Sequence, residues 1–254
     1  TAIWDIIGKT ANLPLHRLFG ACRTKIKTYA SGGLWLSQSI DSLLKDAQNF
    51  LDEGFRSMKI RVGSTNWKND VERVKEVRNA IGPDIELMAD INQALEPKQA
   101  IQLGKKLEEY DLLWLEEPVA SNNREGHAEV RSSLSIPIAS GENEYSLSGM
   151  REMIEAKACD ILMPDLQRIG GISEMRKVAN LAESHNLPIS THIFTEHSLS
   201  VAGSVTNCLS VEHMPWFSKL FNEQIDVING YIDIPERPGT GFTFNDSYIK
   251  QFII

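Results

Sequence analysis

Short apolar runs alternate with longer amphipathic stretches along most of the chain. Between residues 43 and 51, apolar side chains recur at helical spacing with polar ones between them, which predicts a helix with one buried face. The same spacing predicts further helices over Val71–Ile81, Pro97–Glu109, Arg124–Ser133, Ser146–Glu155 and Ser173–Ser184. The short apolar runs predict strands at Lys27–Ala30, Ser57–Val62, Ile85–Ala89, Leu112–Leu115, Ile136–Ala139, Ile161–Met163, Ile189–Thr191 and Cys208–Val211.

This repeated alternation indicates an α/β fold with a parallel sheet, because each helix returns the chain to the same end of the sheet. Eight such units in 254 residues favour a closed TIM-like barrel, which typically needs about 250 residues. A GxGxxG motif after the first strand would favour an open doubly wound sheet instead, and the sequence has none there. No linker or low-complexity tract marks a domain boundary within the barrel region.

The composition excludes several classes of partner. The chain carries 26 Lys and Arg against 34 Asp and Glu, and its basic residues do not cluster, so we expect no nucleic-acid partner. Its three cysteines form no CxxC pair, which indicates a reducing compartment, and we expect a cytoplasmic protein. No apolar run approaches the roughly 18 residues that a membrane span needs, so we expect no membrane partner.

Acidic residues follow three successive predicted strands. Asp90, Glu116 and Glu142 are spaced 26 residues apart, one strand–helix unit each, and an amide follows two of them at Asn92 and Asn143. The carboxyl ends of barrel strands meet at one rim, so these acids would converge there and require a cation. Oxygen ligands without Cys or His favour Mg²⁺ over zinc. Each acid taken alone is equally compatible with a helix cap or a solvated loop.

The remaining strand ends carry groups suited to proton transfer. Lys59 and Arg61 alternate on the second strand, so both side chains point to one face. Asp165, His192 and Glu212 follow or end the sixth, seventh and eighth strands. A histidine beside an aspartate from the adjacent strand forms a general base. Without the neighbouring acids, the basic pair would instead indicate a surface ion pair, and His192 a structural rim histidine.

These residues belong to an ordered series of motifs: WDIIGKTANLPLHRLFG (4–20), MKIR (58–61), ADINQ (89–93), WLEEP (114–118), SGEN (140–143), MPDLQRIGG (163–171), STHIF (190–194), SVEH (210–213) and PGTG (238–241). Together they resemble the enolase superfamily, in its mandelate racemase and muconate lactonizing enzyme family. The resemblance covers essentially the whole chain. It implies a TIM-like (β/α)7β barrel in which Mg²⁺ binds a substrate carboxylate, a base removes the α-proton, and the metal stabilises the enediolate.

The resemblance also assigns roles to the residues at the strand ends. It implies that the acids of the third to fifth strands, Asp90, Glu116 and Glu142, are the metal ligands. Lys59 would neutralise the substrate carboxylate, with help from Asn92.

On the other strands, the resemblance implies that Asp165 and His192 form the catalytic base. Glu212 would be a protonated acid that donates a hydrogen bond to the substrate carboxylate, which requires a raised pKa.

Arg61 departs from the pattern, because the racemase has a second lysine at this position. A guanidinium stays protonated and makes a poor base, whereas racemisation needs a base on each face of the substrate. We therefore expect dehydration of a sugar acid, in which His192 both takes the α-proton and protonates the departing hydroxyl. A racemase, an epimerase and a cycloisomerase are the alternatives, and a barrel that binds a ligand without turnover is less favoured.

The resemblance further indicates how the chain is organised. We expect residues 1–20 to form a helical lead-in segment and residues 21–254 to form the catalytic barrel, with the family's N-terminal capping domain missing. We expect a small carboxylic acid as the substrate and a homo-oligomer as the assembly. His16, His127 and His185 are expected to be solvated on loops or helix ends.

Overall fold

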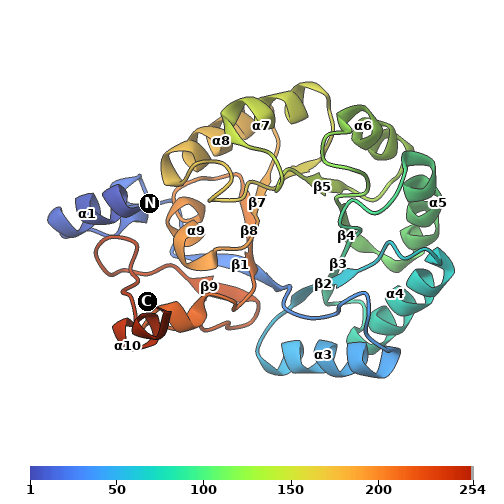
Figure 1. Cartoon of the computed structure of the whole chain (residues 1–254), viewed down its shortest axis with the longest axis horizontal. Coiled ribbons are helices and arrows are strands. Elements are labelled where there is room, and N and C mark those ends of the chain that lie inside the picture. The colour runs from blue at the N-terminus through green and yellow to red at the C-terminus, as the bar shows by residue number, and fades with distance from the viewer. Residues whose placement is uncertain (253–254) are drawn as a thin grey trace.

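The computed structural model describes residues 1–252, and within them all the strands join one sheet (Figure 1). Strand β1 (Lys25–Ala30) pairs in parallel with both β2 (Ser57–Arg61) and β8 (Cys208–His213), which closes eight strands into a barrel. A short β9 (Tyr231–Asp233) lies antiparallel to β1 on the outside of this ring. The other barrel strands are β3 (Glu86–Asp90), β4 (Leu112–Glu116), β5 (Ile138–Ser140), β6 (Ile161–Leu162) and β7 (Ile189–Thr191).

Seven helices follow the first seven strands, so the fold is the (β/α)7β barrel that the sequence predicts. They are α3 (Ile40–Asp52), α4 (Trp67–Ile81), α5 (Pro97–Leu107), α6 (Arg124–Ser133), α7 (Ser146–Glu155), α8 (Ile172–Ser184) and α9 (Thr195–Ala202). The remaining elements are α1 (Ala2–Thr10), α2 (Leu15–Leu18), α10 (Asp246–Ile249) and three 3-10 turns, η1 (Glu108–Tyr110), η2 (Ser218–Leu220) and η3 (Lys250–Phe252).

The predicted elements match the structure to within a few residues, and the sequence pattern missed α9, β9, the short α10 and the turns η2 and η3. Nearly every residue of α9 is buried, and many are Ser or Thr, so no apolar stripe alternates with a polar one. Strand β9 has only three residues, too few for an alternation to be recognised.

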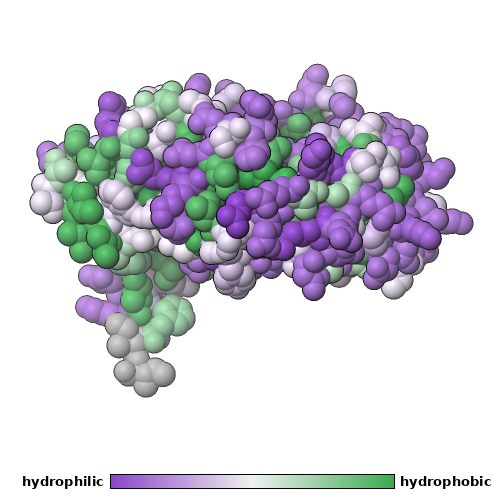
Figure 2. Space-filling model, turned by 90° about the horizontal axis from the view of Figure 1, so that it is seen from above, coloured by the Kyte–Doolittle hydropathy of each residue, from purple (hydrophilic) through white to green (hydrophobic). Residues whose placement is uncertain are grey.

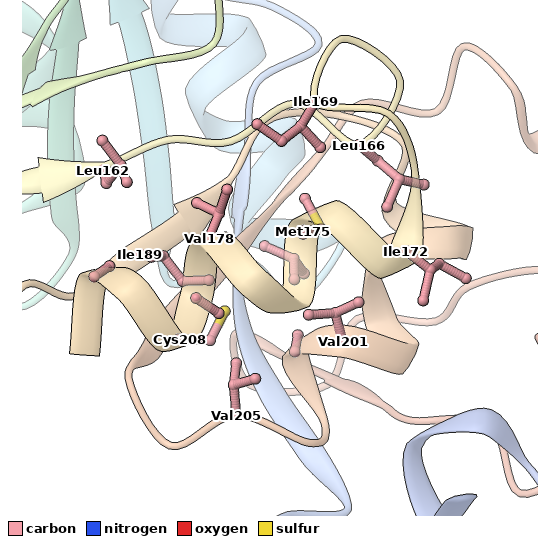
Figure 3. Close-up of a cluster of buried hydrophobic side chains, with 14 of the residues drawn as sticks. Leu162, Leu166, Ile169, Ile172, Met175, Val178, Ile189, Val201, Val205 and Cys208 are labelled. Carbon is pink, nitrogen blue, oxygen red and sulfur yellow. The ribbon is translucent and has the colours of Figure 1, made fainter. Parts of the chain in front are cut away.

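Two large hydrophobic clusters fill the layer between the sheet and the helices. One gathers Met58 and Ile60 of β2 with residues of α3 to α6, and the other joins β6 to β8 with α7 to α9. Figure 3 shows part of the second cluster, where Met175 and Val178 of α8 lie near Ile189 of β7. Because the apolar side chains of each strand face the helices, alternate residues are left for the inside of the barrel.

The lead-in segment packs against the end of the chain. The side chain of Asp5 accepts hydrogen bonds from the backbone N–H and the hydroxyl of Thr240, at 2.9 and 3.1 Å. Trp4 Nε1 donates to Ser173 Oγ of α8 at 2.8 Å. Figure 2 shows hydrophobic surface gathered mainly at the end of the molecule that carries α1 and α10 in Figure 1. The division into a lead-in segment and a catalytic barrel stays a prediction.

Two of the histidine predictions are wrong, because His16 and His127 are both buried. The ring nitrogens of His127 have hydrogen-bond partners in Asn123 O and Ser140 Oγ, both at 3.1 Å, which makes burial of the ring tolerable. His185 is exposed, as predicted. Among the described residues, the three cysteines are free and no helix has the length and apolarity to span a membrane.

Candidate active site

A network of contacts at the carboxyl ends of the barrel strands connects all nine site residues predicted from the sequence. The network runs through residues of β2, β3, β4 and β8 and through the segments that follow β3, β5, β6 and β7. Its members are Lys59, Arg61, Asp90, Asn92, Glu116, Glu142, Asp165, His192 and Glu212. The structure therefore brings these nine side chains together at one rim of the barrel, as predicted.

Alternation along β2 places its two basic side chains in this network. Met58 and Ile60 pack in the hydrophobic layer against the helices, so Lys59 and Arg61 point to the inside of the barrel. Beneath them, the barrel interior is filled by a small cluster that includes Tyr29 of β1. Packed side chains below and open space above confine the charged groups to the carboxyl end of the strands.

Lys59 lies buried among three carboxylates. Its ammonium is 2.5 Å from Glu116 Oε1, 3.0 Å from Glu212 Oε1 and 3.4 Å from Asp90 Oδ2. Although burial opposes its charge, Glu116 and Glu212 raise the pKa of Lys59 well above its ordinary value. Lys59 is therefore a permanent cation rather than a base in this arrangement.

The acids carry more negative charge than the neighbouring cations offset. Burial, together with the charges of Asp90, Glu212 and Glu142, raises the pKa of Glu116 to about 8 against the opposing effect of Lys59. Burial likewise raises the pKa of Glu142. A divalent cation among these groups would relieve both the repulsion and the loss of hydration.

The carboxylate oxygens of the three predicted ligands are suited to a hard cation such as Mg²⁺. Their side-chain conformations in this structure, however, do not surround a common point. In residues 1–252, no three His, Cys, Asp or Glu side chains are grouped closely enough to hold a metal ion. The ammonium of Lys59 lies between Asp90 and Glu116, and Glu142 contacts His192 Nε2 at 3.2 Å and Arg168 Nη1 at 3.4 Å. Assignment of Asp90, Glu116 and Glu142 as metal ligands therefore stays a prediction.

His192 and Asp165 form the pair that the sequence predicts. His192 Nδ1 lies 2.7 Å from Asp165 Oδ2, and Asp165 Oδ1 accepts the backbone N–H groups of Gln167 and Arg168 at 2.8 and 2.9 Å. The carboxylate thus orients the ring so that Nε2 faces the other carboxylates. Although burial opposes charge on the ring, the hydrogen bond to Asp165 and the charges of Glu212 and Glu142 raise the pKa of His192 to about 9.

The role that the resemblance implies for Glu212, a protonated hydrogen-bond donor, stays a prediction, and the contacts of its side chain favour the charged form. Burial raises its pKa, but the charges of Lys59 and His192 outweigh burial and lower the pKa below its ordinary value. Its Oε2 also accepts the backbone N–H of Ile193 at 3.0 Å. Glu212 therefore faces Lys59 as an ion-pair partner, a contact between strands far apart in sequence.

A cavity of about 250 Å³ opens over this network, and its walls include residues that the sequence analysis did not assign. Trp35, Arg168, Met214 and Trp216 line it beside the predicted residues. Arg168 lies in the MPDLQRIGG motif, so its position in the motif was the available signal. The two tryptophans lie in irregular segments, where no periodic pattern reports which way a side chain points.

Another buried acid, Glu117, joins two of the segments that follow the barrel strands. Glu117 is buried and accepts hydrogen bonds from Asn143 Nδ2 at 2.8 Å and from Gln93 Nε2 at 3.1 Å. Burial raises the pKa of Glu117 to about 7. Because Asn143 directly follows Glu142, these hydrogen bonds help to set the path of the chain at the end of β5. Glu117 lies in the WLEEP motif, which by itself gives no indication of these hydrogen bonds.

Comparison with known proteins agrees with this geometry. The family profile described as "Enolase C-terminal domain-like" matches residues 42–248. L-talarate/galactarate dehydratase of Salmonella typhimurium is 36% identical over 96% of this chain and 62% of its own length. D-galactarolactone cycloisomerase of Agrobacterium fabrum is 31% identical over 99% of this chain and 71% of its own. The chain thus spans less than two thirds of the length of the first of these relatives.

Solved structures give the same result. L-talarate dehydratase from Polaromonas sp., complexed with Mg and L-glucarate, superposes with a TM-score of 0.95 at 34% identity over 98% of this chain and 70% of its own. A racemase from Streptomyces coelicolor with bound magnesium superposes with a TM-score of 0.96 at 31% identity, over all of this chain and 70% of its own. The chain therefore belongs to the enolase C-terminal domain-like family, which confirms the enolase-superfamily resemblance of its motifs.

Proposed function

We propose that the protein is a Mg²⁺-dependent dehydratase of sugar acids. The proposal rests on the fact that the cavity has a base on one side only. His192, oriented by Asp165, follows β7, whereas β2, on a different side of the barrel, presents the guanidinium of Arg61. One base that works from one face suits elimination, because the same group can take one proton and return it. The dehydratases among the relatives support the same reaction class.

The chain's own residues would act in a fixed order. His192 Nε2 takes the α-proton while Asp165 accepts the hydrogen bond of Nδ1–H and stabilises the imidazolium. The electrons of the broken C–H bond form a C=C bond as the C–O bond of the β-hydroxyl breaks. The imidazolium then protonates the departing oxygen, so that water leaves. Lys59 and Asn92 would hold the substrate carboxylate throughout.

Asp90, Glu116 and Glu142 would hold the Mg²⁺ ion. When bound, the ion would supply positive charge to the substrate carboxylate and offset the carboxylates that now raise the pKa of His192.

Cycloisomerisation is the second candidate, because D-galactarolactone cycloisomerase is 31% identical to this chain. Racemisation or epimerisation is less favoured because a guanidinium, at Arg61, makes a poor base and Lys59 is held among carboxylates.

The decisive experiment incubates the full-length protein with a panel of sugar acids and Mg²⁺ in D₂O and follows the reaction by NMR. A dehydratase releases a 2-oxo-3-deoxy acid that carries one deuterium at C3. A racemase or epimerase returns an acid deuterated at the α-carbon, and a cycloisomerase opens a lactone or an anhydro ring. Turnover that persists in the absence of Mg²⁺, or formation of the epimer alone, would refute the dehydratase.

We propose a small acid, rather than a nucleic acid or a membrane, as the partner of this site. The expected homo-oligomer stays a prediction, which sedimentation velocity of the full-length protein would test.

A further inference from the structure

The segment that follows β1, residues 31–39, builds one wall of the active-site cavity. Its Trp35 indole lies over the guanidinium of Arg61, with 4.7 Å between the ring centroid and Cζ. Trp35, Arg61 and Asn92 line both the active-site cavity and an adjoining open hollow of about 450 Å³. The stacked pair therefore lies between the charged residues of the active site and the adjoining hollow.

The guanidinium of Arg61 retains a donor without a protein acceptor. The side chain is buried, and its Nη2 donates to Ser31 Oγ at 2.9 Å. Its Nε lies 3.5 Å from Asp90 Oδ2 and makes no hydrogen bond to the described residues. Because Nε is itself buried, a ligand would meet the guanidinium only where Arg61 lines the cavity, and an oxygen atom would be a favourable partner there.

Arg73 of α4 holds the backbone of this segment. Its guanidinium donates to Trp35 O at 2.9 Å, Leu36 O at 2.9 Å and Gln38 O at 2.8 Å, and it also contacts Arg61 O at 3.4 Å. One buried side chain thus ties the segment that carries Trp35 to the strand that carries Arg61. A lysine could not reproduce this fork of donors.

Asp46 of α3 supports the same segment from the other side. Its Oδ2 accepts Gln38 Nε2 at 2.8 Å and the backbone N–H of Leu34 at 3.3 Å. Leu34 adopts a positive φ of 54°, a conformation that these hydrogen bonds help to hold. The segment is therefore fixed by polar contacts, and Trp35 is held in place over Arg61.

We propose that Trp35 and Arg61 form a specificity wall for the hydroxylated carbon chain of the substrate, and that Arg73 is its positioning residue. The C–H face of the chain packs on the indole, and a hydroxyl oxygen accepts a hydrogen bond from Arg61. This inference rests on the proposed function, because it takes a sugar acid as the ligand and assigns the groups that recognise the part beyond its reacting carboxylate.

The test measures binding without turnover, in a His192→Asn background with Mg²⁺. Calorimetry compares D-gluconate, which has the hydroxylated chain, with glycolate, which lacks it. Trp35→Leu should lower the ratio of the two affinities about tenfold, because only gluconate reaches the wall. Trp35→Phe retains an aromatic face and should preserve most of the ratio.

Arg78 supplies a matched control for Arg73. It lies on the same helix and also donates to several backbone carbonyls, those of Gly82, Ile85, Tyr110 and Asp111, but at the amino ends of β3 and β4. Arg73→Lys should lower the affinity ratio and speed amide hydrogen exchange in residues 32–38. Arg78→Lys should cost comparable stability and change neither measurement.

The outcomes separate this inference from the proposed function. If Trp35→Leu weakens both acids equally, or if Arg73→Lys and Arg78→Lys change the ratio alike, the specificity wall is wrong while the dehydratase stands. If no acid in the panel binds to the His192→Asn protein, both proposals fail.

Discussion

The same strands build two regions of opposite character. In the layer between the sheet and the helices, buried residues such as Ile60 and Leu87 form clusters of apolar side chains. At the carboxyl end of the barrel, Lys59 and Glu116 are as deeply buried, yet both are ionisable. Neighbouring residues of one strand, Lys59 and Ile60, belong to different regions because side chains alternate across the sheet. The apolar layer supplies stability, whereas the charged cavity costs stability and is arranged for chemistry.

The largest expected effect separates the two regions by activity. His192→Ala removes the base from the charged cavity, so kcat on the substrate identified by the panel should fall at least about a thousandfold. His192→Ala also removes the partner of the buried Asp165 carboxylate, so stability should fall as well and kcat is compared well below the midpoint of unfolding. His185→Ala, at the exposed end of α8, is the control and should keep full activity. If His192→Ala retained a tenth of the activity, His192 would not be the catalytic base.

A second variant tests the apolar layer. Leu103 of α5 is fully buried, so Leu103→Ala should lower the free energy of unfolding by about 2–5 kcal/mol. Well below the midpoint of unfolding, kcat should remain unchanged because Leu103 lies outside the cavity. Leu113→Ala removes the same atoms from a partly exposed site and should cost much less. Urea denaturation and activity measured on the same samples would check both; equal losses at Leu103 and Leu113 would contradict the burial argument.

The smallest expected effect is a pH dependence of stability at the border of the two regions. His213 of β8 stacks with Phe55, and burial lowers its pKa to about 4. Between this value and the ordinary pKa of about 6.5, the unfolded chain binds more protons at this residue than the folded chain does. Stability should therefore fall as the pH drops from about 6.5 towards 4, with at most about 1.4 kcal/mol per pH unit from His213.

Urea denaturation over this pH range would measure the slope. His213→Gln should flatten it, because the glutamine does not titrate, while other buried groups keep their contributions. An unchanged slope would show that His213 does not titrate between the two states.

Much of the fold was predictable because its signals are local. Strand and helix periods repeat within a few residues, and acids 26 residues apart follow successive strands, so the parallel barrel brings them to one rim. Where that local signal is weak, prediction failed. Nearly every residue of α9 is buried, so it shows no alternation of apolar and polar faces, and the ring of the buried His127 is satisfied by the backbone of Asn123 and by Ser140 of β5.

The sequence by itself determined the (β/α)7β barrel, the residues at its strand ends and the family. Only the tertiary structure decided how those residues pair: Lys59 lies among three carboxylates, Glu212 among them, and Arg73 holds the segment that carries Trp35. Periodicity reports the face of an element on which a side chain lies. Ionisation and hydrogen bonding depend on separations of a few ångströms between segments far apart in the chain, and these are set when the barrel closes.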